Sequence, residues 1–518
     1  MKIKKSYDFV IIGSGFGGAF AAYNLSKAGK EVLVVDRGVW VKRDDSCWDE
    51  IRLHINDPLY RGQTPVMINQ KKKIEIDWPD DTIGGMSTFY GAAAFRLKEN
   101  DFLGAPLPDS DKKNKDSQWP FSYEKLSRFY DEAEKLQGVA GIDGEDITEP
   151  NREVQFPQPP PEILSPPSKR IRDAAKNLGL HPFNIPLAIN FSGKHGKKKC
   201  IQCSTCDHYL CKIEAKNDLS VVVLPEAIKY GTTVLSNTRA IKINTFNNKA
   251  ISVDLIDQST GTISTIHLKT LIVSSGALST PHLLLTSGID SLINNSLIGR
   301  NLMRHANGVI AGLFPFKVNS EKKFQKQIAI PDFYFGDPCK KAGPKGNWGM
   351  IQDVSTIGKE VIKINVPYGL KNIAAFSSNY LINQLCMAED IPQNHNRVYV
   401  DWKRKDKFGM PALRVYHRYH KRDIAARKVL YKEAKKILRK SGALMVYTIN
   451  IETFSHAIGT CKFGKNKNTS VLDPDCKIWG MKNLYALDAS FMPSGGSVNP
   501  SLSIAANSLR VSEMLSNI

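Results

Sequence analysis

The feature that most constrains the fold is a glycine-rich turn near the N-terminus. An apolar, β-branched run at residues 7–13 (YDFVIIG) predicts a buried strand. Gly13, Gly15 and Gly18 follow in the spacing G-x-G-x-x-G, and the residues after them (AFAAYNLSKAG) predict a helix. A second predicted strand, EVLVVD, then ends at Asp36. This strand–turn–helix–strand order is typical of a dinucleotide-binding domain in a doubly wound sheet.

Each part of this unit has a physical role in binding a dinucleotide. Gly13 permits the tight turn, Gly15 lets the backbone approach a pyrophosphate, and Gly18 lets the helix pack close to the strand. The N–H groups at the start of the helix would face the phosphates, and Asp36 would accept hydrogen bonds from the ribose hydroxyls. The motif alone does not separate NAD from FAD. A glycine-rich turn without a ligand is the alternative, which the flanking strands and helix disfavour.

Length and patterning predict more than one domain. A chain of 518 residues is too long for one simple core. Residues 105–165 are rich in proline, aspartate and lysine and predict surface connections around a helix near residues 122–136. Strand-like runs recur at residues 232–274, and a lysine-rich amphipathic helix is predicted near residues 420–440. This interleaving favours discontinuous domains over a simple tandem.

The net charge of +20 raises the question of an anionic partner. The lysines occur in short scattered clusters, without a basic stripe interleaved with aromatic residues, so we expect a solvated surface and no nucleic-acid partner. Peripheral contact with a membrane stays open, although no apolar run reaches the length of a transmembrane helix. The N-terminus superficially imitates a signal peptide, but its glycines belong to the nucleotide-binding turn. We therefore expect a cytoplasmic protein.

Three further blocks carry a resemblance to a known family. They are GGMSTFYGAAAFRL from Gly84, GALSTPHLLLTSG from Gly276, and HAIGTCKFG from His456 with NLYALDASFMPSGGSVNPSLSIAANSLRV after it. With the N-terminal motif, they resemble the glucose–methanol–choline (GMC) oxidoreductases, a family of FAD enzymes, in order and across nearly the whole chain. A smaller match is IGRNLMRH, which begins at Ile298. The second block departs from the family signature at Asp290, where glycine is usual.

The resemblance implies FAD as the cofactor and an α/β fold. A doubly wound FAD-binding domain would be joined to a second, α+β substrate domain built on an antiparallel sheet. The implied division gives the FAD-binding domain residues 1–98, 196–312 and 452–518. The substrate-binding domain takes residues 99–195 and 313–451.

The resemblance also implies the site residues. His456 matches the family's catalytic histidine, and Asn499 matches a second active-site position that is histidine or asparagine in the family. Asp36 replaces the usual glutamate, and Tyr90 stands where many members have asparagine. The implied cofactor-binding residues are Gly13, Gly15, Gly18, Asp36, Arg37, Gly84, Gly85, Ser87, Tyr90, Gly276, Asp488, Asn499, Pro500 and Ser501.

Oxidation of an alcohol to a carbonyl removes a proton from oxygen and a hydride from carbon. Histidine suits the first task because its ordinary pKa lies near working pH. Asparagine cannot act as a base, so Asn499 would orient the substrate oxygen and leave His456 as the base. The predicted function is therefore oxidation of a CH–OH group of an alcohol, sugar or sterol, with hydride passing to flavin N5 and then to an unknown electron acceptor. A lyase that contains FAD, an electron-transfer flavoprotein of the same fold and an NAD(P) dehydrogenase are the alternatives.

Four cysteines lie within twelve residues, at Cys200, Cys203, Cys206 and Cys211. Their spacing, C-x2-C-x2-C-x4-C, is one residue longer at the end than the bacterial ferredoxin run and lacks its proline. An iron–sulphur cluster could carry single electrons from reduced flavin, and zinc could bind the same thiolates. Buried structural thiols or a disulfide are the alternative that we favour, so we predict no metal here.

Overall fold

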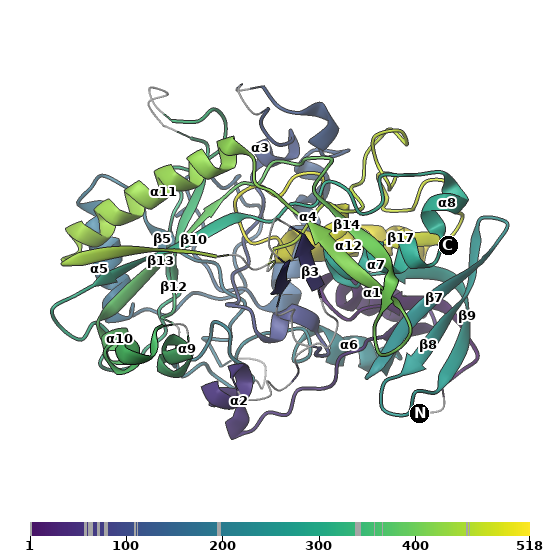
Figure 1. Cartoon of the computed structure of the whole chain (residues 1–518), viewed down its shortest axis with the longest axis horizontal. Helices are drawn as coiled ribbons and strands as arrows, with labels where there is room; N and C mark the ends of the chain where they lie inside the picture. Colours follow the sequence, from purple (N-terminus) through teal and green to yellow (C-terminus); the bar gives the residue numbers. More distant parts are fainter. Residues whose placement is uncertain are drawn as a thin grey trace.

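The computed structural model describes residues 3–55, 60, 66–69, 73–76, 81–107, 110, 112–193, 198–336, 343–356, 358–364, 366–451, 454 and 456–518. Figure 1 shows two main sheets side by side, with the sheet next to both chain ends at the right and the other at the left under helix α11. Among the described residues, no helix is both long and apolar enough to cross a membrane.

The first sheet has seven strands and contains the nucleotide-binding motif. Its order is β6-β2-β1-β9-β8-β7, and β17 also pairs with β9. The strands β6, β2, β1, β9 and β17 are parallel, and β7 and β8 form an antiparallel extension. Every residue of the VLVV run in β2 is buried, as expected for a parallel strand covered on both faces. The bounds are β1 Ser6–Ile12, β2 Val32–Val35, β6 Thr233–Leu235, β7 Thr238–Phe246, β8 Lys249–Asp257, β9 Ile263–Val273 and β17 Leu484–Ala486.

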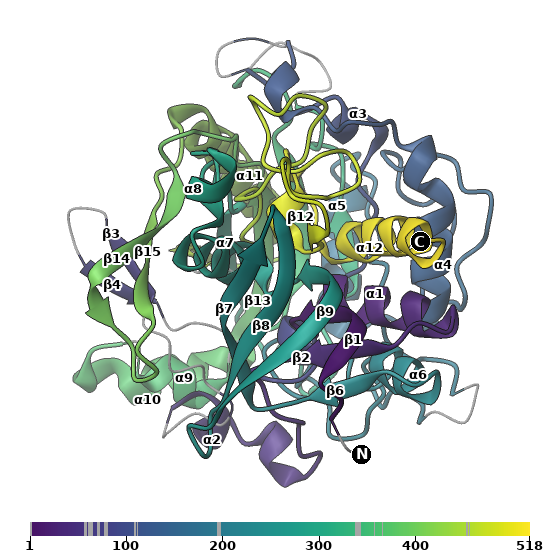
Figure 2. The same cartoon turned by 90° about the vertical axis from the view of Figure 1, so that its right-hand side faces the viewer.

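Helices cover both sides of this sheet. Figure 2 shows α1, α12 and α4 on one side of β1 and β9, and α7 on the other. The long helix α12 packs against both α1 and α4, and α6 packs on α1. The predicted helices after the glycine turn and near residues 122–136 are therefore confirmed. Their bounds are α1 Phe16–Lys27, α4 Glu124–Gln137, α6 Val223–Lys229, α7 Gly276–Thr286 and α12 Ser501–Ser516.

The second sheet has six antiparallel strands in the order β16-β10-β13-β12-β11-β5. Helices α11 and α5 cover one face, with apolar side chains such as Ile310, Ile351 and Leu430 between them. The lysine-rich helix predicted near residues 420–440 is α11, and its apolar stripe faces this sheet. The bounds are β5 Phe183–Asn184, β10 Ala306–Leu313, β11 Ile328–Ile330, β12 Gly349–Val354, β13 Leu381–Ala388, β16 Met445–Asn450, α5 Pro166–Lys176 and α11 Lys421–Lys440.

A four-stranded sheet, in the order β14-β15-β3-β4, joins distant parts of the chain. Its strands are β14 Arg397–Lys405, β15 Pro411–Tyr416, β3 Val66–Asn69 and β4 Lys73–Ile76. The remaining helices are short: α2 Glu50–His54, α3 Glu99–Phe102, α8 Ile289–Ile293, α9 Lys359–Ile364 and α10 Lys371–Ser377. Together the sheets confirm the expected fold class, a doubly wound domain with a second α+β domain on an antiparallel sheet.

The domain boundaries remain a prediction, and two of them, residues 196 and 452, lie outside the described residues. Strand β10 (Ala306–Leu313) belongs to the six-stranded sheet. A division by sheets would therefore fall before Ala306 instead of after residue 312. Helix α4, which the prediction gave to the substrate domain, packs on α12 of the nucleotide domain.

A buried ionic network fastens α4 to the block that begins at Gly84. Arg96, at 1% exposure, donates to both carboxylate oxygens of Glu134 at 2.9 and 2.7 Å. Arg152 binds the same carboxylate from another direction, at 2.7 and 2.9 Å. Burial alone would raise the pKa of Glu134, but the hydrogen bonds from the two arginines hold it below its ordinary value. Glu134 thus lies between two buried cations, and each of these also pairs with a second carboxylate, Arg96 with Asp131 at 2.6 Å and Arg152 with Glu149 at 2.9 Å.

Replacing Glu134 by glutamine keeps the side-chain shape but removes the charge. We expect Glu134→Gln to lower the free energy of unfolding by about 3 kcal/mol, because it removes the one carboxylate that both buried guanidinium groups share and leaves each with only more exposed carboxylate partners. Urea unfolding followed by circular dichroism measures this. The matched control is Glu124→Gln, which changes an exposed glutamate of the same helix and should cost less than about 1 kcal/mol. Equal losses in the two variants would contradict the network's role.

Candidate active site

The glycine turn after β1 is shaped by close backbone contacts on one side and open space on the other. A Cβ added at Gly17 would lie 1.3 Å from the Leu487 carbonyl oxygen, and one at Gly18 would lie 1.9 Å from the Gly13 oxygen. A Cβ at Gly15 would meet no atom within 4 Å. The turn therefore packs tightly against its own domain but leaves room beside Gly15, where α1 begins and its N–H groups have no helical partner.

Asp36 anchors the turn from the end of β2. Its Oδ2 accepts hydrogen bonds from the backbone N–H and the hydroxyl of Ser14, at 2.7 and 2.5 Å, and its Oδ1 accepts one from Gly38 N–H at 2.7 Å. A carboxylate has about four acceptor positions, so capacity remains for a ribose hydroxyl. The Ser14 hydroxyl also accepts a bond from Gly84 N–H at 2.9 Å and so ties the turn to a second glycine loop.

This second loop lies directly against the first, beside the open space at Gly15. Gly84 and Gly85 have φ angles of +92° and +57°, which strain any other residue. A Cβ at Gly85 would lie 3.3 Å from the Gly15 Cα. The Ser87 hydroxyl closes the loop by donating to the Gly84 carbonyl at 2.7 Å. Two side-chain-free backbone segments thus flank one space, an arrangement that suits a pyrophosphate.

Several other predicted cofactor residues bond to the protein itself. Asp488 is buried and accepts hydrogen bonds from Gly276 N–H at 2.9 Å, from Ser490 N–H at 2.7 Å and from the Thr280 hydroxyl. Burial raises its pKa, and these bonds oppose the shift. Asp488 therefore joins the end of β17 to the start of α7, which is an internal task in addition to any contact with a ligand.

Tyr90 and Arg37 are likewise held by protein groups. The Tyr90 hydroxyl donates to the Asn217 carbonyl at 3.1 Å and accepts from Gln137 at 3.2 Å. Arg37 forms an ion pair with Asp81 at 2.7 Å. Pro500 precedes the first turn of α12, and the Ser501 hydroxyl bonds to the Ala93 carbonyl at 3.3 Å.

His456 and Asn499 come together, although 43 residues separate them. The amide nitrogen of Asn499 lies 3.3 Å from Nε2 of His456, next to the start of α12. On the other side of the ring, Nδ1 of His456 lies 2.9 Å from Nδ1 of His305. Asn499 also accepts a 3.3 Å hydrogen bond from the amide nitrogen of Gln352, on β12.

Both histidines are electrically neutral at pH 7. Burial is the main cause that lowers the pKa of His456 well below its ordinary value, and the nearby His305 and the ammonium of Lys326 lower it further. Burial likewise lowers the pKa of His305 to about 4. A neutral imidazole has one ring nitrogen free to accept a proton, so this pair can supply a general base.

His305 and Gln352 are the two site residues that the sequence analysis missed. His305 ends the IGRNLMRH turn, and its position there was a usable signal. Gln352 interrupts the apolar strand GMIQDV, and it is fully buried. A buried glutamine in such a strand marks a polar contact across the sheet face.

The four clustered cysteines are unpaired. Among the described residues, no group of three or more histidine, cysteine, aspartate or glutamate side chains is placed to hold a metal ion. Two of the four cysteine sulphur atoms accept hydrogen bonds from nearby backbone groups: Gln202 N–H donates to Cys200 Sγ at 3.3 Å, and Lys216 N–H donates to Cys211 Sγ at 3.4 Å. The geometry gives no support to an iron–sulphur or zinc site.

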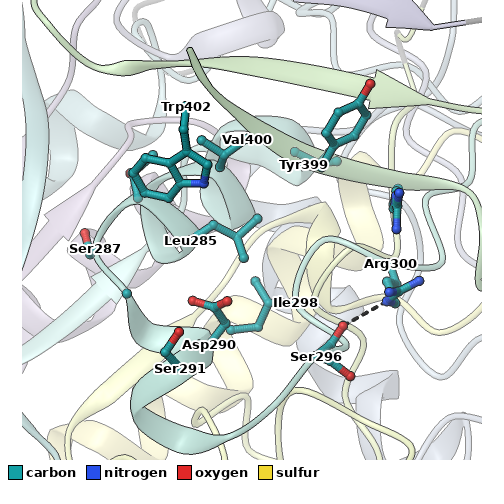
Figure 3. Close-up of a pocket in the computed structure, with 14 residues that line it drawn as sticks. Leu285, Ser287, Asp290, Ser291, Ser296, Ile298, Arg300, Tyr399, Val400 and Trp402 are labelled. Atoms are coloured by element: carbon teal, nitrogen blue, oxygen red, sulfur yellow. Dashed lines mark hydrogen bonds between the residues drawn. The ribbon is translucent and has the colours of Figure 1, made fainter. Parts of the chain in front are cut away.

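The pocket in Figure 3 is separate from these residues. It has a volume of about 630 Å³ and lies among α7, the turn after α8 and β14. Its lining includes Asp290, Arg300 and Trp402, with Leu285 and Ile298 between them. Neither His456 nor the glycine turns line it, so it is not the candidate active site. Tyr334 and Trp348 are buried in the two main hydrophobic cores and do not line it either.

Family models match most of the chain. One described as GMC oxidoreductase matches residues 76–307, and a second with the same description matches residues 392–508. A model of an NAD(P)-binding Rossmann-like domain matches residues 11–39. The two GMC models together span more than half of the chain and include the second glycine loop, both histidines and Asn499.

Similar proteins extend over almost the full length. The chain is 27% identical to 6'''-hydroxyparomomycin C oxidase of Streptomyces lividus, over 99% of this chain and 91% of that protein. It is 28% identical to 2-methyl-1,2-propanediol dehydrogenase of Mycolicibacterium austroafricanum, over 98% and 95%. Among solved structures, pyridoxine 4-oxidase from Mesorbium loti has a TM-score of 0.69 at 16% identity, over 99% of each chain. The last likeness shows a shared fold.

The lowered pKa of His305 predicts that part of the protein's folding stability is lost as the pH falls. The value falls from 6.5 to about 4 on folding, so the unfolded chain takes up a proton between these pH values that the folded chain does not. Stability from this residue is present above pH 6.5 and is lost as the pH falls towards about 4. We expect the thermal midpoint of His305→Asn to fall less between pH 7.5 and pH 5 than that of the unchanged protein. His267→Asn, at an exposed histidine, is the control and should fall as steeply as the unchanged protein.

Proposed function

This chain belongs to the GMC oxidoreductase family, and from that membership we propose that it is an FAD-dependent enzyme that oxidises the CH–OH group of a small molecule to a carbonyl. The observation that carries the proposal is the 3.3 Å approach of Asn499 to Nε2 of His456 at the start of α12. The relatives named above as an oxidase and a dehydrogenase support the reaction class.

The residues around the two glycine loops fit FAD. The open space beside Gly15, the facing backbone of Gly84 and Gly85, and the remaining acceptor capacity of Asp36 suit its pyrophosphate and ribose. The N-terminus of α12, preceded by Asn499 and Pro500, would favour negative charge on the ring system. When bound, FAD supplies the two-electron acceptor for the hydride that leaves the substrate carbon.

The chain's own residues handle the proton. We propose that His456 accepts the hydroxyl proton of the substrate at Nε2, because its other ring nitrogen is engaged by His305. Asn499 donates a hydrogen bond from its amide nitrogen to the same substrate oxygen and so orients it. Since burial keeps His456 neutral, the base is ready at pH 7 without first losing a proton.

A hydroxylated, polar substrate is the proposed class. The paromomycin oxidase and the propanediol dehydrogenase are named for such molecules. The polar side chain of Gln352 extends the hydrogen-bonding groups from Asn499 on to the antiparallel sheet. A panel of diols, sugars and aminoglycosides with an artificial electron acceptor tests this class, and bleaching of the flavin by none of them would favour the lyase or electron-transfer alternatives.

Removing the imidazole of His456 tests the base. We expect His456→Ala to retain FAD but to slow flavin reduction by about 10²-fold or more, because no other group takes the hydroxyl proton directly. Anaerobic stopped-flow absorbance with the best alcohol of the panel measures the rate. His267→Ala, at an exposed histidine, should reduce its flavin at the unchanged rate. An undiminished rate in His456→Ala would remove this residue from the base role.

The glycine turn offers a separate test of the cofactor site. Gly15→Ala places a methyl group in space that no protein atom occupies, so we expect the apoprotein to melt within about 1 °C of the unchanged apoprotein while bound FAD falls at least tenfold. Gly17→Ala should instead destabilise the apoprotein, because its methyl group would overlap the Leu487 carbonyl. Gly369→Ala, which also fills open space but lies elsewhere, should change neither quantity. Full FAD occupancy in Gly15→Ala would contradict the assignment.

A further inference from the structure

The contact between His305 and His456 constrains which ring nitrogen of each histidine carries a proton. Their Nδ1 atoms are 2.9 Å apart, which is a hydrogen-bond distance. Because both rings are neutral, one Nδ1 must carry the proton and the other must accept it. The identity of the donor decides whether Nε2 of His456 is a free lone pair or an N–H group, and only a lone pair can accept a proton.

The far side of His305 does not fix the donor. Its Nε2 is buried beside Gly495 and has no hydrogen-bond partner among the described residues. The proton positions of the pair are therefore fixed from the other side of His456, by Asn499.

Hydrogen bonds to neighbouring residues hold the backbone around His305 in place. The Tyr419 hydroxyl donates to the His305 carbonyl at 3.1 Å, and the preceding N–H, of Arg304, donates to buried Asp390 at 2.8 Å. His417 binds the same Asp390 carboxylate at 2.7 Å. This buried hydrogen-bond network thus fixes the position from which the His305 imidazole contacts His456.

The hydrogen bonds of Asn499, on the other side of His456, decide the tautomer. Gln352 donates from Nε2 to Oδ1 of Asn499 at 3.3 Å, which turns the Asn499 amide so that its nitrogen faces His456. An amide nitrogen only donates, so the atom that it meets, Nε2 of His456, must be an acceptor. With Nε2 as the acceptor, Nδ1 of the neutral His456 ring carries the proton and donates to Nδ1 of His305.

We propose that His305 and Gln352 are positioning residues that hold His456 as the Nδ1–H tautomer. The Nε2 lone pair, which meets the Asn499 amide nitrogen in this structure, then accepts the proton of the substrate oxygen that takes the place of that contact. The inference rests on the proposed function of His456 as the base. Among the described residues, the charged or titratable groups that act on His456 are His305 and Lys326, and Lys326 is itself paired with Asp207 at 3.2 Å. In this scheme neither His305 nor Gln352 touches the substrate. His305 acts through His456, and Gln352 acts through Asn499.

Nitrogen NMR reads the tautomer without any turnover. With ¹⁵N-labelled histidine, and with the signals of His456 assigned by their loss in His456→Gln, we expect Nδ1 to show a bonded proton and Nε2 the shift of a bare nitrogen at pH 7.5. The expected change in Gln352→Glu is a shift of the proton towards Nε2, because a carboxylate would draw the amide nitrogen of Asn499 away. A His456 signal with the proton on Nε2 in the unchanged protein would overturn the proposal, whatever the enzyme's activity.

Matched variants separate positioning from packing. His305→Leu removes the acceptor, and we expect flavin reduction to slow by about 10- to 100-fold with FAD retained. His305→Asn places an amide oxygen where Nδ1 lay and should recover most of that loss. Gln352→Glu should slow reduction more than the apolar Gln352→Met, since only the former turns the Asn499 amide around.

The outcomes distinguish this inference from the proposed function. If no alcohol reduces the flavin of the unchanged protein, the proposed function fails, and the NMR measurement still decides the tautomer. If reduction occurs but His305→Asn is as slow as His305→Leu, or Gln352→Met is as slow as Gln352→Glu, the residues only fill space and the positioning role is wrong.

Discussion

The site depends on a tight joint at the carboxyl ends of three parallel strands. Ser274 follows β9, and its N–H donates to the Ile12 carbonyl at 2.7 Å while its hydroxyl donates to the Leu487 carbonyl at 2.7 Å. The Gly17 backbone lies against that same Leu487 carbonyl, where no side chain fits. Segments that are more than 200 residues apart therefore end at one edge of the sheet. This edge is where doubly wound sheets bind their ligands.

The joint also explains why the histidine and the asparagine meet. The chain leaves β17 through Asp488 and returns to the sheet as α12, so the turn that carries Asn499 is fixed at both ends. His456 comes from a segment bridged to Met303, next to β10: the Met303 and Ile458 backbones exchange hydrogen bonds at 3.0 and 2.9 Å. The same short bridge brings His305 within reach of His456. The nucleotide-binding sheet thus sets one half of the site, and the antiparallel sheet sets the other.

Sequence patterns could predict the parts of the site that act locally. Gly13 to Asp36 form one continuous unit, and the blocks around His456 and Asn499 each carry their own motif. Gln352 could not be found this way, because its contact with Asn499 depends on the register of β12 against β13 and on which face of that sheet turns inward. A shift of one residue would point Gln352 at α11 instead. The same dependence on sheet pairing explains why the predicted boundary at residue 312 cut through β10.

Local sequence patterns also do not predict the hydrogen bonds that Asp488 and Tyr90 form within the protein. Both were expected to face the cofactor, and both are held by hydrogen bonds to protein groups that no local pattern reveals. The cysteine run is similar. Buried Lys216 donates to the carbonyls of Tyr90, Cys206 and Tyr209, at 3.0, 3.2 and 2.7 Å. The buried ammonium group of Lys216 therefore holds the loop that carries the cysteines against the loop that carries Tyr90.

An asparagine at position 499 is consistent with a base that has a histidine on its other side. A histidine there would place His456 between two imidazoles, each able to exist in two tautomers or to take up a proton, and the proton positions would be poorly determined. The amide of Asn499 does not titrate, and its oxygen and nitrogen ends are fixed by Gln352. Burial lowers the affinity of His456 for a proton, which weakens it as a base but keeps it unprotonated. A fixed donor on one side and a fixed acceptor on the other offset part of that weakness, because the ring needs no change of tautomer before it meets the substrate.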